Sequence, residues 1–522
     1  MGDWARRVPA PGLTVPLVLF LLLRLPSFFE PHWYTDEAGY ATTAWLTTHG
    51  KVLYLTVWNN KPPLLFWIYD LALTWLGPSE IALHLLSGLA GAVALAGTWM
   101  LAKMCLSPGR IRVAMITAAV LLGTPLLNAE LALPECFLIA FTVWGMVCLL
   151  AARPSRGPAR ALLLAALAGV LFGAACLIQQ TSLADAVAGL LVVGITVRGG
   201  WRVVVVGAVL VLVTFGLALV PYLQAAGAHN VFFFLVKTYQ GYTAASLHPG
   251  LGSIGPRVVV AGLLVWGIWW ARHWSPERLL PWVWLVVLLL AYGAPNRAYA
   301  HFLLPAVPAG VLILGRATPF RRRRWTTGLR SGPLPLVGAA GVAALIWIGL
   351  IVGQLSGGSL FTVKLTAEYY PAFVARIAGI ISPVGQAGLY ERFPQAEGEA
   401  LSWLSQHHLR DVTAVVWSAD SWPYLLGQLT PVLPVPPIYM DQNWLGAKAL
   451  VARVRSARPE IVIVTQNTYP SPALIAPLLH SRYTEVEAGG GGQLWLRSDV
   501  AASLRAEPVP RSVPSPASPA KE

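Results

Sequence analysis

Charged residues are scarce in this chain. Asp, Glu, Lys and Arg make up 11% of its 522 residues, and acidic residues number only 23. Soluble domains carry about 25% charged residues, so this composition excludes an ordinary water-soluble protein. Hydrophobic residues reach 56% and gather in runs of about 16–25 residues, the length of a helix that crosses a bilayer. The sequence therefore predicts a polytopic α-helical membrane protein.

Cysteine is also rare, and an excess of negative charge is absent. The four cysteines lie in or beside hydrophobic runs, so we expect no disulfide framework. The net charge of +14 comes from short Arg clusters between those runs. That distribution is typical of the cytoplasmic loops of membrane proteins. We therefore expect the lipid bilayer as a partner and no nucleic acid.

The positions of the Arg clusters predict the topology. The first hydrophobic run, 13–29, follows Arg6 and Arg7 and is not followed by a small-residue cleavage site, so we expect a retained helix with a cytoplasmic N-terminus. The run 62–77 is short and contains Asp70, which favours a helix along the outer interface. If all Arg clusters between the runs are cytoplasmic, the chain crosses the membrane about 11–13 times and its C-terminal part lies outside. The further spans are 81–102, 113–127, 135–152, 161–178, 183–197, one ending near 222, 257–271, 279–293, 301–315 and 334–354.

Four segments are expected. Residues 1–356 form the transmembrane module, whose first outer loop is 30–80, and residues 357–381 form an interfacial linker. Residues 382–501 are expected to form a small extracytoplasmic α/β domain, because apolar strand patterns alternate with helix patterns. The predicted strands are 413–418, 461–465 and 493–497, and the predicted helices are 397–408 and 445–456. The Pro- and Ser-rich tail, 502–522, is expected to be disordered.

The first outer loop carries the chemistry-bearing residues. It contains Asp36 and Glu37 among aromatic residues and, some twenty residues later, Lys61-Pro62-Pro63. Ionisable groups beside a bilayer are costly and are therefore functional candidates. The carboxylates can act as a general base or bind a divalent cation, or they can simply solvate the loop. Lys61 can bind a phosphate, or its ammonium can reach from a helix start to the interface.

This order of motifs resembles the GT-C glycosyltransferases, in the branch of aminoarabinose transferases and protein O-mannosyltransferases. The segment 297–305 is similar to that family's Tyr-Leu-Leu-Pro segment. The resemblance implies a GT-C fold and a polyprenyl-phosphate-linked sugar as donor. It implies transfer with inversion to a lipid, glycan or protein acceptor, on the outer face of a bacterial cytoplasmic membrane.

The resemblance also implies roles for particular residues. Asp36 matches the family's essential first-loop aspartate, as a base or as a carboxylate that orients the acceptor or a metal. Glu37 and Tyr40 match its neighbours, Lys61 matches the lysine facing the donor phosphate, and Glu135 matches a second acidic position. A carboxylate favoured by a helix N-terminus is the alternative for Glu135.

Some positions depart from the family or extend the site. The aminoarabinose branch has Glu where Asn60 stands and Tyr where Trp58 stands, which argues against a metal ion at that position and against lipid A as the acceptor. The candidate ligands of a divalent cation are Asp36 and Glu135. Arg297, Tyr299 and His301 lie at the start of the tenth predicted span. The Arg297 guanidinium can bind a phosphate bidentately and His301 can donate a hydrogen bond to it. Alternatively, these residues only solvate the loop and pack against the helix. The catalytic candidates are Asp36, Glu37 and Glu135, and the substrate-binding candidates are Tyr40, Asn60, Lys61, Lys237, Arg297, Tyr299 and His301.

Two other functions are alternatives. A transporter of lipid-linked substrates predicts ionisable residues deep in several spans and broken helices in corresponding halves. In this sequence the candidate charges gather on one predicted face, and no internal repeat is evident. A non-catalytic scaffold of envelope assembly does not require Asp36, Glu37 and Lys61 together. The sequence therefore favours a membrane glycosyltransferase.

Overall fold

A computed structural model describes the chain at residues 11–238, 254–293, 299–317, 361–390, 393–434, 437–465, 469–486 and 492–506, with a few helical positions between 337 and 344. The chain divides into two compact units, Met1–Glu391 and Arg392–Glu522.

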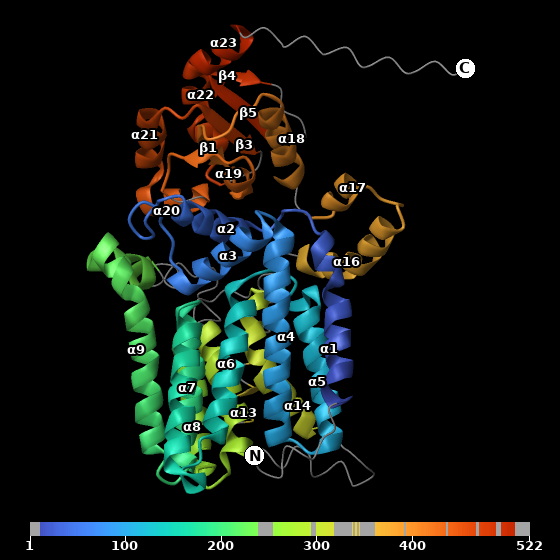
Figure 1. Cartoon of the computed structure of the whole chain (residues 1–522), viewed down its shortest axis with the longest axis vertical. Coiled ribbons are helices and arrows are strands. Elements are labelled where there is room, and N and C mark those ends of the chain that lie inside the picture. The colour runs from blue at the N-terminus through green and yellow to red at the C-terminus, as the bar shows by residue number, and fades with distance from the viewer. Residues whose placement is uncertain are drawn as a thin grey trace. The chain divides into compact units, whose positions relative to one another are not determined.

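A bundle of long helices forms the larger part of the first unit (Figure 1). Its helices are α1 (Pro11–Arg24), α4 (Glu80–Cys105), α5 (Pro108–Gly123), α6 (Pro134–Ala151), α7 (Pro158–Cys176), α8 (Leu183–Thr196), α9 (Trp201–Ala226), α12 (Ile254–Trp270), α13 (Pro276–Tyr292) and α14 (Val307–Ala317). Short elements join or extend them: η2 (Leu25–Phe29), η3 (Pro125–Leu127), η4 (Pro154–Arg156), η5 (Gln180–Ser182), α10 (Ala228–Phe232), η6 (Phe233–Lys237) and η7 (Ala300–Ala306).

These helices confirm the predicted class of polytopic α-helical membrane protein. Within the described residues, six helices are long and apolar enough to cross a membrane: Gly12–Phe29, Glu80–Cys105, Pro134–Ala151, Pro158–Cys176, Trp201–Ala226 and Ala300–Ala317. The helices α5, α8, α12 and α13 are shorter, at 14–17 residues, and coincide with further predicted spans. The last predicted span, 334–354, lies outside the described ranges apart from isolated positions.

Small residues let neighbouring helices approach closely. A Cβ atom at Gly169 of α7 would lie 2.5 Å from the backbone oxygen of Gly207 in α9, so only glycine fits there. Helices in lipid have no hydrophobic drive to associate with one another, and close backbone packing at small residues replaces it. Elsewhere on α9, Leu212 and Leu217 are about two-thirds exposed, as expected for side chains that face lipid.

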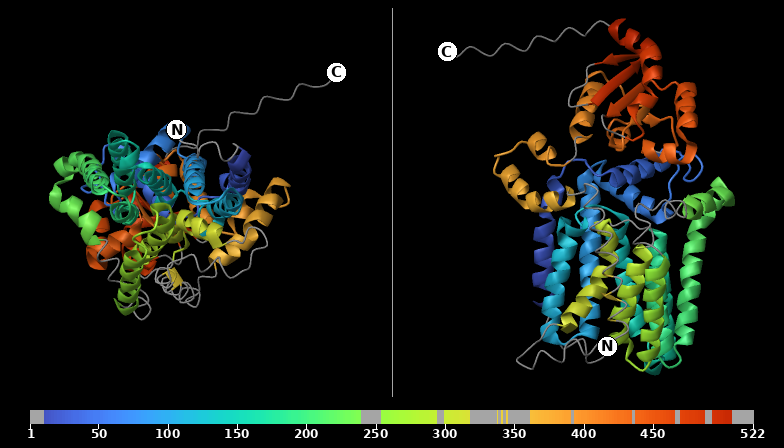
Figure 2. Two further views of the ribbon diagram at one scale, coloured as in Figure 1. Left: turned by 90° about the horizontal axis from the view of Figure 1, so that it is seen from below. Right: turned by 180° about the vertical axis from the view of Figure 1, so that it is seen from behind.

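Two shorter helices lie across one end of the bundle, crosswise to its long helices (Figures 1 and 2). They are α2 (Thr35–Thr48) and α3 (Pro63–Leu76). Pro62 and Pro63 favour the start of α3, because a helix does not use the missing N–H groups at its first positions. The run 62–77, predicted as an interfacial helix, therefore forms a helix across the end of the bundle.

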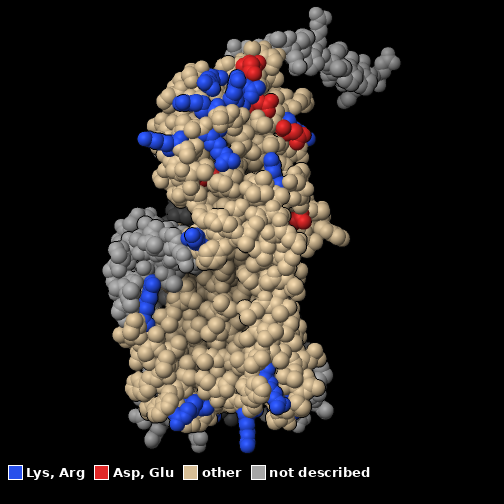
Figure 3. Space-filling view, turned by 90° about the vertical axis from the view of Figure 1, so that its left-hand side faces the viewer, with Lys and Arg blue, Asp and Glu red and all other residues tan. Residues whose placement is uncertain are grey.

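Basic residues mark the opposite end. Figure 3 shows Lys and Arg side chains at the lower end of the bundle, below a broad surface with little charge. This arrangement agrees with the clustering of Arg between hydrophobic runs. The sidedness predicted from it, with the N-terminus inside, stays a prediction.

Two further helices belong to the first unit. They are α16 (Phe361–Ile377) and α17 (Pro383–Ala387). The Tyr369 hydroxyl donates a hydrogen bond to Glu30, and the Tyr370 hydroxyl donates to the Leu23 oxygen at 3.1 Å, which joins α16 to the end of α1. The predicted limits at 356, 381 and 501 stay predictions.

The second unit is a small α/β domain. Its five strands are ordered β2-β1-β3-β5-β4; β2, β1 and β3 are parallel, and β5 is antiparallel to both β3 and β4. The strands are β1 (Thr413–Trp417), β2 (Thr430–Pro431), β3 (Ile461–Thr465), β4 (Tyr483–Val486) and β5 (Gly492–Arg497). The other elements are α18 (Phe393–Gln406), α19 (Trp422–Leu426), α20 (Ile438–Leu445), α21 (Ala447–Ala457), η9 (Pro472–Leu474), α22 (Ala476–Arg482) and α23 (Ser498–Ala506).

The longer strands of this unit follow the predicted pattern. The predicted strands coincide closely with β1, β3 and β5; β1 and β3 are almost wholly buried, and so is the middle of β5. The strand β2 has two residues and β4 has a half-exposed pattern, so neither gives an apolar run to recognise.

A buried carboxyl pair lies where β1 ends. Glu397 and Asp420 are 3% and 0% exposed, and the Ser418 hydroxyl donates to Glu397 Oε1 at 2.9 Å. Burial, and then the neighbouring Asp420, raise the pKa of Glu397 well above its usual value. The folded state therefore holds a proton that an exposed glutamate would lose.

Replacing Glu397 by Gln is expected to increase the protection of β1 and β3 against hydrogen exchange at pH 8, and to change it little at pH 4. Because the folded pKa is raised above the ordinary 4.5, the wild type loses stability as the pH rises from 4.5 towards the folded pKa. The slope is about 1.4 kcal/mol per pH unit. Exchange measured by mass spectrometry on the full chain, compared with wild type at each pH, tests this. The exposed Glu399→Gln in the same helix is the control, and an equal effect at both pH values contradicts the prediction.

Candidate active site

The first turn of α2 presents two neighbouring carboxylates. Asp36 and Glu37 follow Tyr34, the residue that caps the helix, and a helix N-terminus favours negative charge. Asp36 is partly buried and Glu37 is fully buried. Because consecutive helix positions point about 100° apart, the two carboxylates face different surroundings.

The loop between α2 and α3 fixes Lys61. Tyr54 is fully buried with φ of +69°, a conformation uncommon for residues other than glycine. Its hydroxyl donates to the Lys61 backbone oxygen at 2.7 Å. The Lys61 backbone N–H donates to Asn59 Oδ1 at 3.2 Å, and Asn59 in turn donates to Thr43 of α2 at 3.3 Å. The backbone of Lys61 is therefore tied to both the loop and α2.

The Lys61 side chain is joined to Glu135 through Gln179. Lys61 Nζ donates to Gln179 Oε1 at 3.3 Å, and Gln179 Nε2 donates to Glu135 Oε1 at 2.9 Å. Glu135 and Gln179 are 1% and 2% exposed. The ammonium also lies 6.0 Å from the centre of the Tyr40 ring, within reach of a cation–π contact. One polar chain thus joins the loop before α3 to the starts of α6 and η5.

Asp36 is electrostatically linked to the same group. Burial raises the pKa of Asp36, His301 and Lys61 oppose that rise, and Glu135 and Glu37 add to it. His301 is 5% exposed and stacks on the Tyr299 ring, with ring centres 5.5 Å apart. The arrangement gathers a carboxylate with a raised pKa, an ammonium and an imidazole. It can accept a proton and neutralise an anion.

The other predicted residues have different placements. Asn60 takes part through its backbone oxygen, which accepts from Gln180 Nε2 at 3.1 Å. Gln180 also donates to Leu235 of η6 at 3.1 Å. Lys237, two residues further along, is exposed and has no interaction with Asp36 or Lys61 in the described structure. Arg297 lies outside the described residues.

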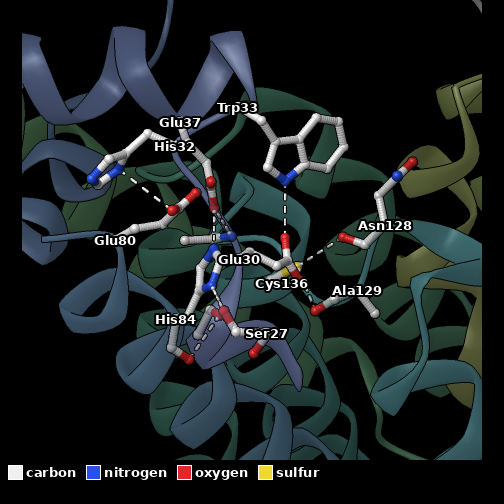
Figure 4. A network of polar contacts seen from close by, with 12 residues as sticks. Ser27, Glu30, His32, Trp33, Glu37, Glu80, His84, Asn128, Ala129 and Cys136 are labelled. Atoms are coloured by element: carbon white, nitrogen blue, oxygen red, sulfur yellow. Dashed lines mark hydrogen bonds and ion pairs between the residues drawn. The ribbon is translucent and has the colours of Figure 1, made fainter. Parts of the chain in front are cut away.

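Glu37 belongs to a second, adjoining cluster (Figure 4). Its Oε1 lies 3.2 Å from His84 Nε2 and accepts a hydrogen bond from the Ala132 backbone N–H. Glu80 Oε2 lies 3.4 Å from His32 Nδ1. The ligand atoms of Glu37, Glu80 and His84 lie within 4.8 Å of one another.

This cluster bears on the predicted cation. Among the described residues, no other group of three or more His, Cys, Asp or Glu side chains is as close. It includes Glu37 but neither Asp36 nor Glu135, so a cation on those two carboxylates stays a prediction.

Sequence reasoning missed several supporting side chains. Gln179 stands between two hydrophobic runs, and this position was a usable signal. Glu80 and His84 lie one helical turn apart on α4, four residues from one another, so they face the same side. Their partner Glu37 is more than forty residues away in sequence, so only the fold brings them together.

No family model and no curated protein matches the sequence. Solved structures do match it. The structure of ArnT from Cupriavidus metallidurans bound to undecaprenyl phosphate is 18% identical, with a TM-score of 0.59, and the match covers 95% of this chain and 99% of that one. The apo state of the same protein is 17% identical, with a TM-score of 0.55 and coverage of 94% and 99%.

These matches establish the fold. The chain has the GT-C fold that the resemblance implied. It shares this fold with the aminoarabinose transferase ArnT over nearly its full length.

Replacing Gln179 by Met is expected to destabilise the protein by about 1–3 kcal/mol, because buried Glu135 loses a hydrogen-bond donor. Thermal unfolding of the full chain in detergent measures the loss. In a variant that also carries Glu135→Gln, the carboxylate that would be left unpaired is gone. The double variant should therefore lose less than the sum of the single losses, whereas strict additivity contradicts the coupling.

Proposed function

We propose that this protein is a membrane glycosyltransferase. It transfers a sugar from a polyprenyl-phosphate donor to an acceptor hydroxyl, at the outer face of a bacterial cytoplasmic membrane. The supporting observation is the gathering of Asp36, Lys61 and Glu135 at one end of a bundle with the fold of ArnT, whose structure holds undecaprenyl phosphate.

Lys61 is the proposed phosphate-binding residue. Its backbone is fixed by Tyr54 and Asn59, so its ammonium is held near Tyr40 and Gln179 before the donor arrives. A charge placed in advance stabilises the negative charge that develops on a leaving phosphate. Tyr299, His301 and Arg297 are proposed to complete this side of the site, while the polyprenyl tail stays in the bilayer. Lys237 is proposed to cover the donor.

Asp36 is the proposed general base. It takes the proton of the acceptor hydroxyl as the oxygen attacks the anomeric carbon. The bond between that carbon and the phosphate oxygen breaks, and the phosphate leaves with the electron pair. One displacement inverts the anomeric centre without a covalent enzyme intermediate. A carboxylate with a raised pKa is a stronger base, which suits this role.

The remaining assignments follow from contacts. Glu135 receives a hydrogen bond from Gln179 and is proposed to orient the chain that ends at Lys61. Glu37 was predicted as catalytic, and its contacts with His84 and Ala132 favour a positioning role beside Asp36. A cation on Asp36 and Glu135 is tested by assaying with and without EDTA.

Replacing Asp36 by Asn should lower sugar transfer or hydrolysis by about 10²–10⁴-fold, because the general base is lost. The assay uses purified protein with a panel of short-chain polyprenyl-phosphate sugars, followed by mass spectrometry. Asp70→Asn, on the neighbouring helix α3, is the matched control and should retain activity. Equal activity of Asp36→Asn and wild type would exclude this site. Inactivity of the wild type despite lipid binding would favour a transporter or a scaffold.

Replacing Lys61 by Ala should weaken the binding of undecaprenyl phosphate at least tenfold, because the ammonium that faces the phosphate is removed. Binding to the purified protein is measured by native mass spectrometry or fluorescence competition. Lys51 lies in the same loop and is exposed, so Lys51→Ala is the control. Similar losses in both variants would indicate a general charge effect instead of a phosphate site.

A further inference from the structure

The Glu37–Glu80–His84 cluster combines negative charge with burial. The side chains of Glu37 and His84 are 0% exposed, and that of Glu80 is 4% exposed. Two carboxylates this close repel each other in a medium of low dielectric constant, and burying them without compensation is costly. His84 faces Glu37 and His32 faces Glu80, and each imidazole balances its carboxylate only when it is protonated. The cluster therefore calls for a proton or a further cation.

Arg24 is a permanent cation beside His84, and its hydrogen bonds go to other groups. Its guanidinium donates to the backbone oxygens of Ala129 and His84 and to the Ser87 hydroxyl. These bonds fix the backbone around His84 without reaching the carboxylates of Glu37 or Glu80.

The orientation of His84 is that of a metal ligand. Its Nδ1 lies 2.6 Å from the backbone oxygen of Ser27 and donates its hydrogen there. In the neutral ring, Nε2 then carries a lone pair that faces Glu37 Oε1 at 3.2 Å. Two lone pairs do not face each other at this distance unless a proton or a metal ion lies between them. An N–H donated from the second ring nitrogen to a backbone oxygen is the usual support of a metal-bound histidine.

The spacing also fits a metal ion. Two ligand atoms of one tetrahedral zinc ion, each bonded at about 2.0–2.1 Å, lie about 3.3 Å apart. In addition, Glu37 Oε2 is buried and has no hydrogen-bond partner in the described part of the structure. The Glu37 side chain points towards His84 and Glu80 (Figure 4). An unpaired buried oxygen beside a second carboxylate and an imidazole is placed to coordinate a metal ion.

We propose that Glu37, Glu80 and His84 bind a divalent transition-metal ion of the zinc class, with His32 as the fourth ligand. His32 Nδ1 lies 3.4 Å from Glu80 Oε2. Mixed imidazole and carboxylate ligands suit zinc, whereas calcium and magnesium prefer oxygen ligands alone. The ion joins α2, the segment before it and the start of α4. This role is structural and does not depend on the proposed transferase function.

The test measures metal binding and stability and does not use enzyme activity. Full-length protein is purified in detergent, and its zinc content is measured by elemental mass spectrometry before and after dialysis against a chelator. We expect about one zinc per chain, loss after chelation, and a melting temperature that falls by several degrees and recovers with zinc. Calcium and magnesium should not restore it.

Variants identify the ligands. Glu80→Gln and His84→Gln should lower the zinc content at least tenfold. Glu130→Gln removes another fully buried glutamate outside the cluster and should leave the zinc content unchanged. Equal zinc content in wild type and Glu80→Gln would overturn the ligand set.

Wild-type protein alone also decides the question if the variants do not fold. Cobalt added to the chelated protein should give the intense visible absorption of a tetrahedral cobalt site, and zinc should remove it. The zinc site would be overturned if that absorption were absent and if chelator and zinc left the melting temperature unchanged. Those results would assign the contact to an ion pair between Glu37 and protonated His84.

Discussion

The hydrogen bonds of the buried Arg24 hold together the segments that surround Glu37. Arg24 is the last residue of α1, and its guanidinium donates to Ala129, before α6, and to Ser87 and His84 of α4. A guanidinium cannot lose its proton, and Nη1 and Nη2 of Arg24 find acceptors inside the protein. By doing so it fixes three segments that are distant in sequence. The chain before α6 can then present Ala132 to Glu37, and α4 can present His84.

The same end of the bundle carries two different kinds of polar site on adjacent residues. Asp36 interacts with Lys61, Glu135 and His301, whereas its neighbour Glu37 contacts His84 and Ala132. Helical geometry separates the two directions by about 100°, so one turn of α2 serves both. The first direction leads to a site that can bind an anion and accept a proton. The second leads to a closed cluster that can hold α2 in place.

Much of this could be predicted from composition and spacing. Hydrophobic runs gave the helices of the bundle to within a few residues, because a lipid-spanning helix must be apolar along its length. The motifs in the first loop made Asp36 and Lys61 candidates, because charge beside a bilayer is costly to retain. The bonds through Gln179 and the Glu80–His84 pair were missed, because each depends on residues that meet only after several helices have packed.

The sequence by itself determined that the chain is a membrane protein, which segments are helical, and where its costly charges lie. Those properties depend on local composition and on periodicity. Only the tertiary structure decided that Asp36 comes under the electrostatic influence of His301 while Glu37 pairs with His84. These contacts join residues of α2 to η7 and to α4, and the directions of helical side chains become specific partners only when the helices are packed.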